Sequence, residues 1–150
     1  MDRLTVAIDI DSPVQEVFDY VAEQRNYTSW CRKLSGCELT SDGKMEVGAT
    51  KIMTPSTMGM NFEWEFICDE YEVPNKMVWH SDNDPRIRMI DILDFESVSG
   101  GTRVVHHLDM DLGGFLKWVK PLAHRRGRND MMTDLVHLKE IIESRTEAQR

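Results

Sequence analysis

The alternation of apolar and polar residues predicts that much of this chain forms β-strands. From residue 4 to residue 10 every second position is apolar, which is typical of a strand with one buried face. These positions are Leu4, Val6, Ile8 and Ile10. The apolar spacing then changes to the three-and-four pattern of a helix, at Val14, Val17, Phe18 and Val21. A second short helix is expected to carry Trp30.

Between residues 36 and 112 the pattern predicts about six short strands joined by turns. Turn-forming strings such as SDGK, VPNK and SGGT separate the strands. The gaps are too short for crossover helices, which favours antiparallel hairpins. The clearest strand covers residues 60–73, and its inward face carries Met60, Phe62, Trp64, Phe66 and Cys68. On the next strand, Trp79 is expected to face inward.

A long helix is predicted from about Leu122 to Glu143. Its apolar stripe consists of Met131, Leu135, Leu138 and Ile142, widened by Met132, Val136 and Ile141. The order of strand, two helices, antiparallel strands and long helix predicts a single α+β domain over residues 1–150, with a polar tail from about residue 144. A strongly curved sheet with this helix across its concave face would bury both apolar surfaces.

The charge and the cysteines narrow the classes of partner and compartment. A net charge of −8, from 26 acidic and 18 basic side chains, argues against nucleic acid as a partner, because phosphates need a basic surface. The start MDRLTVAIDID has acids where a signal peptide has its apolar core, and no apolar run is long enough to span a membrane. We therefore expect a cytoplasmic protein. Cys31, Cys37 and Cys68 have no paired spacing and are expected to be free thiols.

Five local strings occur in a characteristic order: SPVQEVFDYVAEQRNYTSW, the VG at Val47–Gly48, FEWEFICDEYEVPNKMVW, SGGTRV and PLAHRRGRNDMMTDLVHLKEIIE. Together they resemble the SRPBCC (START-like, helix-grip) superfamily, in its polyketide cyclase/dehydrase and lipid-transport-like branch, over residues 3–144. The resemblance implies a helix-grip fold, in which a curved antiparallel sheet wraps around a long C-terminal helix. Members of the superfamily bind sterols, lipids, quinones or polyketides under that helix, and only some branches catalyse a reaction.

The stretch VVHHLDMDLGG, residues 104–114, gathers the residues with the most obvious chemistry. On a strand it divides into two faces, with His106 on the apolar face and His107 on the outer face beside Asp109 and Asp111. Two outer-face ligands make an incomplete site, so we expect no metal and no cofactor. His106 has three open roles. It could bond a backbone or hydroxyl partner in the core, bind a ligand carbonyl, or act as a general base.

The sequence favours the binding, transport or sequestration of a hydrophobic small molecule such as a lipid, quinone or polyketide. Tyr27 and His106 would orient the polar end of this ligand. The predicted cavity is lined by Tyr27, Trp30, Met60, Phe62, Trp64, Phe66, Trp79, Met89, His106, Leu108, Met110, Met131, Met132 and Leu135. Met60, Phe62, Trp64 and Phe66 leave one wall of this cavity apolar, and no nucleophile elbow, P-loop or HExxH string occurs. Both observations favour binding over catalysis, and a reaction that depends on His106 or Tyr27 stays open. Two alternatives stay open, a polyketide cyclase or dehydratase that uses His106 as acid–base and an interaction module with a filled cavity.

Residues 112–129 hold five basic side chains and no acidic one. The resemblance places this segment near the mouth of the cavity. Arg125, Arg126 and Arg128 could there meet an anionic head group, an acidic carrier protein or a membrane surface, or they could form an ordinary solvated helix face. Homodimerisation through an exposed strand edge also stays open.

Overall fold

The structure, a computed structural model, describes residues 2–56 and 62–149, with the side chain of Phe115 excepted. The α-helices are α1 (Val14–Ala22), α2 (Tyr27–Trp30) and α3 (Lys120–Ala148), and the 3-10 helices are η1 (Gln24–Asn26) and η2 (Gly114–Val119). The strands are β1 (Asp2–Ile10), β2 (Leu34–Leu39), β3 (Thr50–Pro55), β4 (Trp64–Glu72), β5 (Lys76–Asp84), β6 (Ile87–Val98) and β7 (Gly101–Leu112). This order confirms the predicted α+β helix-grip fold.

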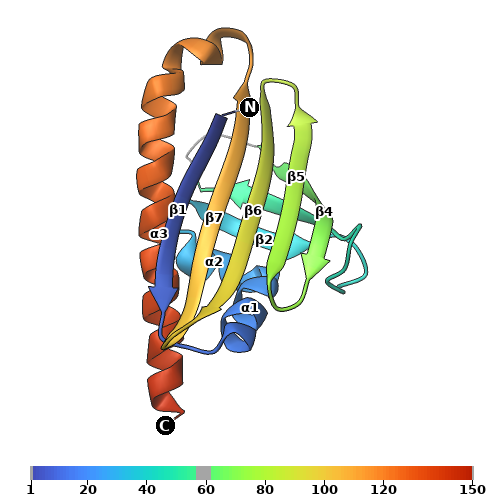
Figure 1. The fold of residues 1–150 in the computed structure, drawn as a ribbon. Helices are drawn as coiled ribbons and strands as arrows, with labels where there is room; N and C mark the ends of the chain where they lie inside the picture. The colour runs from blue at the N-terminus through green and yellow to red at the C-terminus, as the bar shows by residue number, and fades with distance from the viewer. Residues whose placement is uncertain (1, 57–61, 150) are drawn as a thin grey trace.

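The strands form one antiparallel sheet in the order β1-β7-β6-β5-β4-β3-β2. Strands β2 to β7 follow one another as neighbours, whereas β1 pairs with β7. In that pairing Val6 lies opposite His106, and Leu4 lies opposite Leu108. Figure 1 shows the sheet curling so that β2 passes behind β6, while α3 runs along β1. The curl gives the sheet an inner face that α1, α2 and α3 partly cover.

At one end of the sheet, α1 fills the space inside the curl. Val17 and Phe18 have no exposed surface, because the apolar side of α1 is turned towards the strands. The Phe18 ring lies edge-on to Phe95 on β6 at 5.1 Å between centroids, and it stacks on Tyr71 of β4 at 5.5 Å. Such ring pairs fix how closely α1 approaches the sheet. This end of the inner face is therefore a closed apolar core.

The stripe predicted for the long helix is confirmed, since Met131, Leu135, Leu138 and Ile142 are all buried. Val136 is 37 % exposed, so it does not widen the stripe. It lies about 100° around the helix from Leu135, which turns it towards solvent.

Helix α3 is longer at both ends than predicted. It begins at Lys120 because Pro121 fits the first turn, where its missing N–H needs no partner. It continues to Ala148, where the Thr146 hydroxyl lies 3.1 Å from that of Ser12.

One other predicted feature, the start of the clearest strand, changes in the structure. Strand β4 begins at Trp64 instead of residue 60, and Phe62 precedes it with its ring edge-on to Trp64 at 5.7 Å. Met60 lies outside the described residues. The glycine pair after β7 connects that strand to η2, and Gly114 has φ 62, which suits glycine best. The later start of β4 leaves Trp64, Phe66 and Cys68 on one face of this strand.

Candidate functional site

Burial along the inner face of β7 falls from one end of the strand to the other. Val104 has no exposed surface. The following inward positions, His106, Leu108, Met110 and Leu112, are only half-buried. The closed end lies against α1, and the half-buried end lies beside η2 and the start of α3 (Figure 1). The inner face of β7 is thus closed at the α1 end and incompletely covered at the α3-start end.

His106 stands where the closed and half-buried parts of this face meet, and it is paired with Asp91. The two residues come from the neighbouring strands β7 and β6, and both side chains point inward. The Nε2 atom of His106 donates a hydrogen bond to Oδ1 of Asp91. The side chains are 13 % and 14 % exposed. The other ring nitrogen, Nδ1, is buried and has no protein hydrogen-bond partner.

Asp91 is ionised in this pair. Its burial opposes the charged form, but the charge of His106, the hydrogen bond from His106 and the charge of Lys51 together hold the pKa of Asp91 below its ordinary value. A carboxylate on Nε2 fixes the orientation of the imidazole and leaves Nδ1 free to exchange a proton or a hydrogen bond. This is how a histidine is arranged when it binds a polar group or acts as acid–base.

Asp134 adds a second carboxyl group near His106, from α3. Burial raises the pKa of Asp134 to about 6, although the charge of His106 acts in the opposite direction. The backbone N–H of Arg32 also donates to this carboxyl group. Asp134 lies three residues after Met131, so it occupies the inward side of the helix. The imidazole of His106 therefore has acidic side chains near it from both the sheet and the helix.

Lys51 on β3 is a cation buried deep in the same interior, with 1 % of its surface exposed. Its Nζ donates to Oε1 of Gln24 at 2.9 Å. It also lies 3.9 Å from the ring centroid of Trp79 and 4.5 Å from that of Tyr27. The faces of these rings attract a cation, which offsets part of the cost of its burial. Burial lowers the pKa of Lys51.

Several buried polar atoms of the tyrosine and tryptophan side chains have no protein partner. They are the hydroxyl of Tyr27 and the indole Nε1 atoms of Trp30, Trp64 and Trp79. A buried donor without a partner is unfavourable by about 1–3 kcal/mol, so such groups normally bind water or a ligand. Burial also raises the pKa of Tyr27 well above its ordinary value, which keeps its hydroxyl protonated as a donor. The interior thus offers several hydrogen-bond donors to a molecule that enters it.

The structure brings most of the predicted cavity residues to the inner side of the sheet and α3. Those that are buried are Tyr27, Trp30, Phe66, Trp79, Met89, Met131 and Leu135. Those that are half-buried are Phe62, Trp64, His106, Leu108, Met110 and Met132. Arg125, Arg126 and Arg128 are exposed in the first half of α3. The outer-face assignment of His107 also holds, because its Nδ1 bonds the Thr5 hydroxyl at 2.8 Å.

Outside the apolar wall predicted around Phe62, Trp64 and Phe66, the structure also turns Lys51, Asp91 and Asp134 inward. Asp91 has a readable signal, since it falls between Met89 and Leu93 in the alternation of β6. Lys51 has none, because β3 carries apolar residues on both faces and its inner face is set only by pairing with β4. The absence of ionisable groups therefore no longer argues against catalysis.

Three further observations concern the described residues. Among the described residues, no group of three or more His, Cys, Asp or Glu side chains is placed to hold a metal ion. Four hollows on the described surface are lined by side chains other than His106 and Asp91; one lies between α1 and the end of α3, with Glu16, Glu23 and Arg145 among its walls. In the part of the chain that the structure describes, no helix is both long and apolar enough to cross a membrane.

Comparison with known proteins identifies the family. The family described as "Polyketide cyclase / dehydrase and lipid transport" matches residues 1–143, so the chain belongs to it. No curated protein matches the sequence.

Solved structures share the fold at low identity. TTHA0849 from Thermus thermophilus is 16 % identical with a TM-score of 0.80, covering 95 % of this chain and 98 % of that one. SA2116 from Staphylococcus aureus, titled a protein of unknown function, is 12 % identical with a TM-score of 0.74, covering 97 % of each chain. The hypothetical protein jhp0584 from Helicobacter pylori is 9 % identical with a TM-score of 0.76, covering 93 % of this chain and 87 % of that one. At these identities the likeness establishes the fold alone.

Proposed function

We propose that this protein binds a hydrophobic small molecule against the inner face of its sheet, with the polar end of the ligand at His106. Family and fold suggest a protein that holds a hydrophobic ligand in a cavity. The observation that carries the proposal is the fall in burial along β7, from a closed core at Val104 to half-buried apolar residues beyond His106. Apolar surface left half-covered inside a fold gains about 25 cal/mol per Å² when a ligand covers it.

The polar groups at the inner end of this surface favour an amphipathic ligand. His106 Nδ1 is buried without a protein partner, and Leu108 and Met110 continue the apolar surface outward. A ligand hydroxyl that donates to Nδ1 of the neutral ring, or a ligand oxygen that accepts from Nδ1 of the charged ring, would satisfy this atom, while an apolar tail would cover Leu108 and Met110. A lipid, a quinone or a polyketide each has an oxygen-bearing end and an apolar body. Binding, transport and sequestration all use this same arrangement.

The neighbouring histidines on β7 allow a matched test of the proposal. Native mass spectrometry of the protein purified from its host should show a copurified hydrophobic molecule. His106→Gln removes the inward imidazole and is expected to weaken binding of that molecule about tenfold, the effect of one lost hydrogen bond in a buried site. His107→Gln changes the outer face of the same strand and should leave binding unchanged. Equal loss in both variants, or no bound molecule in the wild type, would contradict the proposal.

A second candidate function, that of a polyketide cyclase or dehydratase, is favoured by one specific observation. The ionised Asp91 on Nε2 of His106 orients the imidazole so that Nδ1 of the neutral ring could accept a proton from a ligand carbon and return it to a departing oxygen. The two functions separate in His106→Ala. If this variant still binds the copurified molecule but no longer converts it, the protein is an enzyme. If wild type and variant both leave the molecule unchanged, binding alone is its function.

A further inference from the structure

One end of the molecule exposes large apolar side chains that nothing in the fold covers. Trp118 is 88 % exposed, Leu122 is 68 % exposed and Val119 is 46 % exposed. They occupy the end of η2 and the first turn of α3, at the outermost point of this end of the fold (Figure 1). Trp118 and Leu122 are four residues apart, so they share one side of the helical segment. We call Trp118, Val119 and Leu122 the apolar tip.

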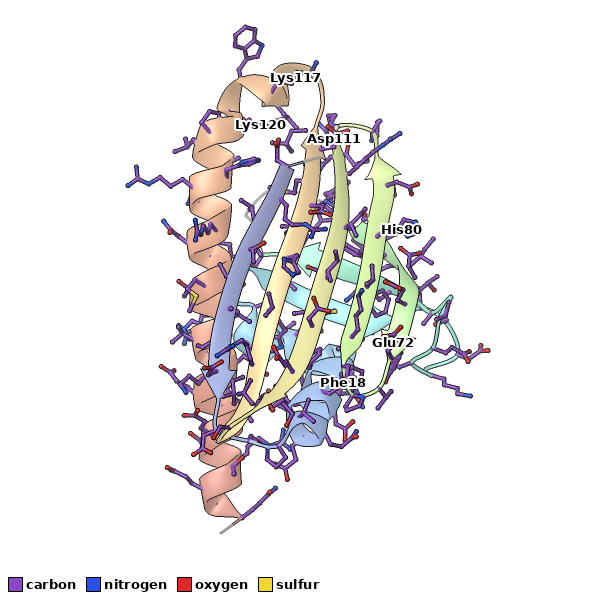
Figure 2. All side chains as sticks on the ribbon, in the orientation of Figure 1. Phe18, Glu72, His80, Asp111, Lys117 and Lys120 are labelled. Carbon is purple, nitrogen blue, oxygen red and sulfur yellow. The ribbon has the colours of Figure 1, made fainter. Side chains whose placement is uncertain are left out.

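Basic residues surround the apolar tip. Lys117 is exposed beside Trp118, and Figure 2 shows it at the turn between β7 and α3 together with Lys120. Arg125 and Arg126 continue the exposed side of α3 that begins at Trp118 and Leu122, at the next helical turn. Residues 112–129 contain no acid, whereas the whole chain has a net charge of −8. The positive end of the α3 dipole adds to this local charge.

Acidic side chains near the tip neutralise only part of this charge. Asp2 is paired with Lys120, and Asp84 is paired with Arg86 in the turn between β5 and β6. Asp111, at the end of β7, is exposed and appears near Lys117 in Figure 2. Within the described ranges, Lys117, Arg125 and Arg126 take part in no ion pair. The net field around the apolar tip is therefore positive in an acidic protein.

We infer that the apolar tip docks this protein onto an anionic lipid bilayer. A projecting tryptophan inserts at the depth of the lipid head groups, and the flanking lysine and arginines contact their phosphates. The remaining surface is strongly acidic and is repelled by the same membrane, which orients the molecule with this end down. A protein partner fits less well, because three side chains at a convex point offer much less than the about 800 Å² that a specific interface buries on each side.

The position of the tip links docking to the inner face of the sheet. The half-buried end of that face, at Met110 and Leu112 of β7, leads through Gly113 directly into η2. Docking would hold this end against the lipid, where an apolar molecule could pass without crossing water. The apolar tip can dock onto the bilayer without such transfer, even if the interior binds no ligand.

The test measures binding of the full chain to vesicles of phosphatidylcholine alone and of phosphatidylcholine with phosphatidylglycerol. We expect binding to the anionic vesicles only, weakening as salt screens the charges. Trp118 is the one fully solvent-facing tryptophan among the described residues, since Trp30 and Trp79 are buried and Trp64 is half-buried. Anionic vesicles should therefore shift its emission to the blue and protect it from iodide, and Trp118→Phe should remove both signals.

Two variants make the test specific to the tip. Trp118→Ala and Leu122→Ser should each weaken vesicle binding about tenfold or more. Val47→Ser is the matched control, because Val47 is 62 % exposed in the loop between β2 and β3, and it should bind as the wild type does. Absence of binding to the anionic vesicles at low salt, or equal binding by all three variants, would overturn the inference. Two other results would also overturn the inference. If polyglutamate protects Trp118 from iodide and vesicles do not, the tip binds an acidic protein. If sedimentation shows self-association that protects Trp118, the tip binds a second copy of this chain.

Discussion

Asp134 gives a quantitative test of how the interior is organised. Its carboxyl group lies on the inward side of α3, and burial raises its pKa to about 6. Asp134→Asn removes the charge and keeps both the size of the side chain and an acceptor for the Arg32 N–H. The variant should therefore be more stable than the wild type wherever the wild-type carboxyl group is ionised.

The sign and size follow from linkage. The folded pKa of Asp134 lies above the unfolded value of about 3.8, so the folded state holds this proton more tightly. The stability that the protonated group contributes is therefore complete below about pH 4 and is lost as the pH rises through 6. The difference between the two pKa values corresponds to about 3 kcal/mol, and partial exposure to solvent reduces this to about 1.5 kcal/mol. Asp134→Asn should match the wild type near pH 4 and exceed its free energy of unfolding by about 1.5 kcal/mol at pH 8.

Urea unfolding followed by far-ultraviolet circular dichroism, at several pH values, measures this difference directly. The control is Glu140→Gln, which removes one charge from the exposed side of the same helix and should show no such pH-dependent gain. If the stability difference between Asp134→Asn and the wild type is the same at pH 4 as at pH 8, Asp134 does not occupy a desolvated site, and the placement of an acid beside His106 is refuted.

Two further predictions concern the packing of the fold. Gly101→Ala should lower the free energy of unfolding by about 3 kcal/mol or more. The reason is that φ is +154° at this position and a Cβ would lie 2.1 Å from the carbonyl oxygen of Ile10. A melting temperature within about 3 °C of the wild type would contradict this prediction. Burial raises the pKa of Cys31, Cys37 and Cys68. All three thiols should therefore react slowly with an aromatic disulfide reagent at pH 8 and rapidly after unfolding. The absorbance of the released aromatic thiolate measures both rates.

The sequence predicts the fold well because the apolar pattern is regular where the fold is regular. The stripe from Met131 to Ile142 is buried as its spacing indicates, and the alternation of β7 correctly separates His106 from His107. The apolar pattern does not predict the ends of helices that are set by tertiary contacts. Thr146 at the end of α3 looks like part of a polar tail, yet it is placed by contact with Ser12, which is remote in sequence.

The candidate site was less predictable, because its ionisable groups interrupt apolar patterns without breaking them. Asp91 and Asp134 each occupy a position whose neighbours mark it as inward, and a strict count of periodicity finds both. Lys51 is different. Its burial depends on the rings of Trp79 and Tyr27, which come from another strand and from a helix, and on Gln24. No local pattern records such a three-way tertiary contact.

The pairing of β1 with β7 has a consequence for how this protein is made. On the ribosome, the hairpins from β2 to β6 can close as soon as their strands emerge, since each partner is next in the chain. Strand β1 is synthesised first but has only β7 to pair with, about ninety residues after its own end. Until then Leu4, Val6 and Ile8 are exposed on an unpaired strand that other chains could bind. Nascent chains halted before β7 should therefore be the species that most needs a chaperone.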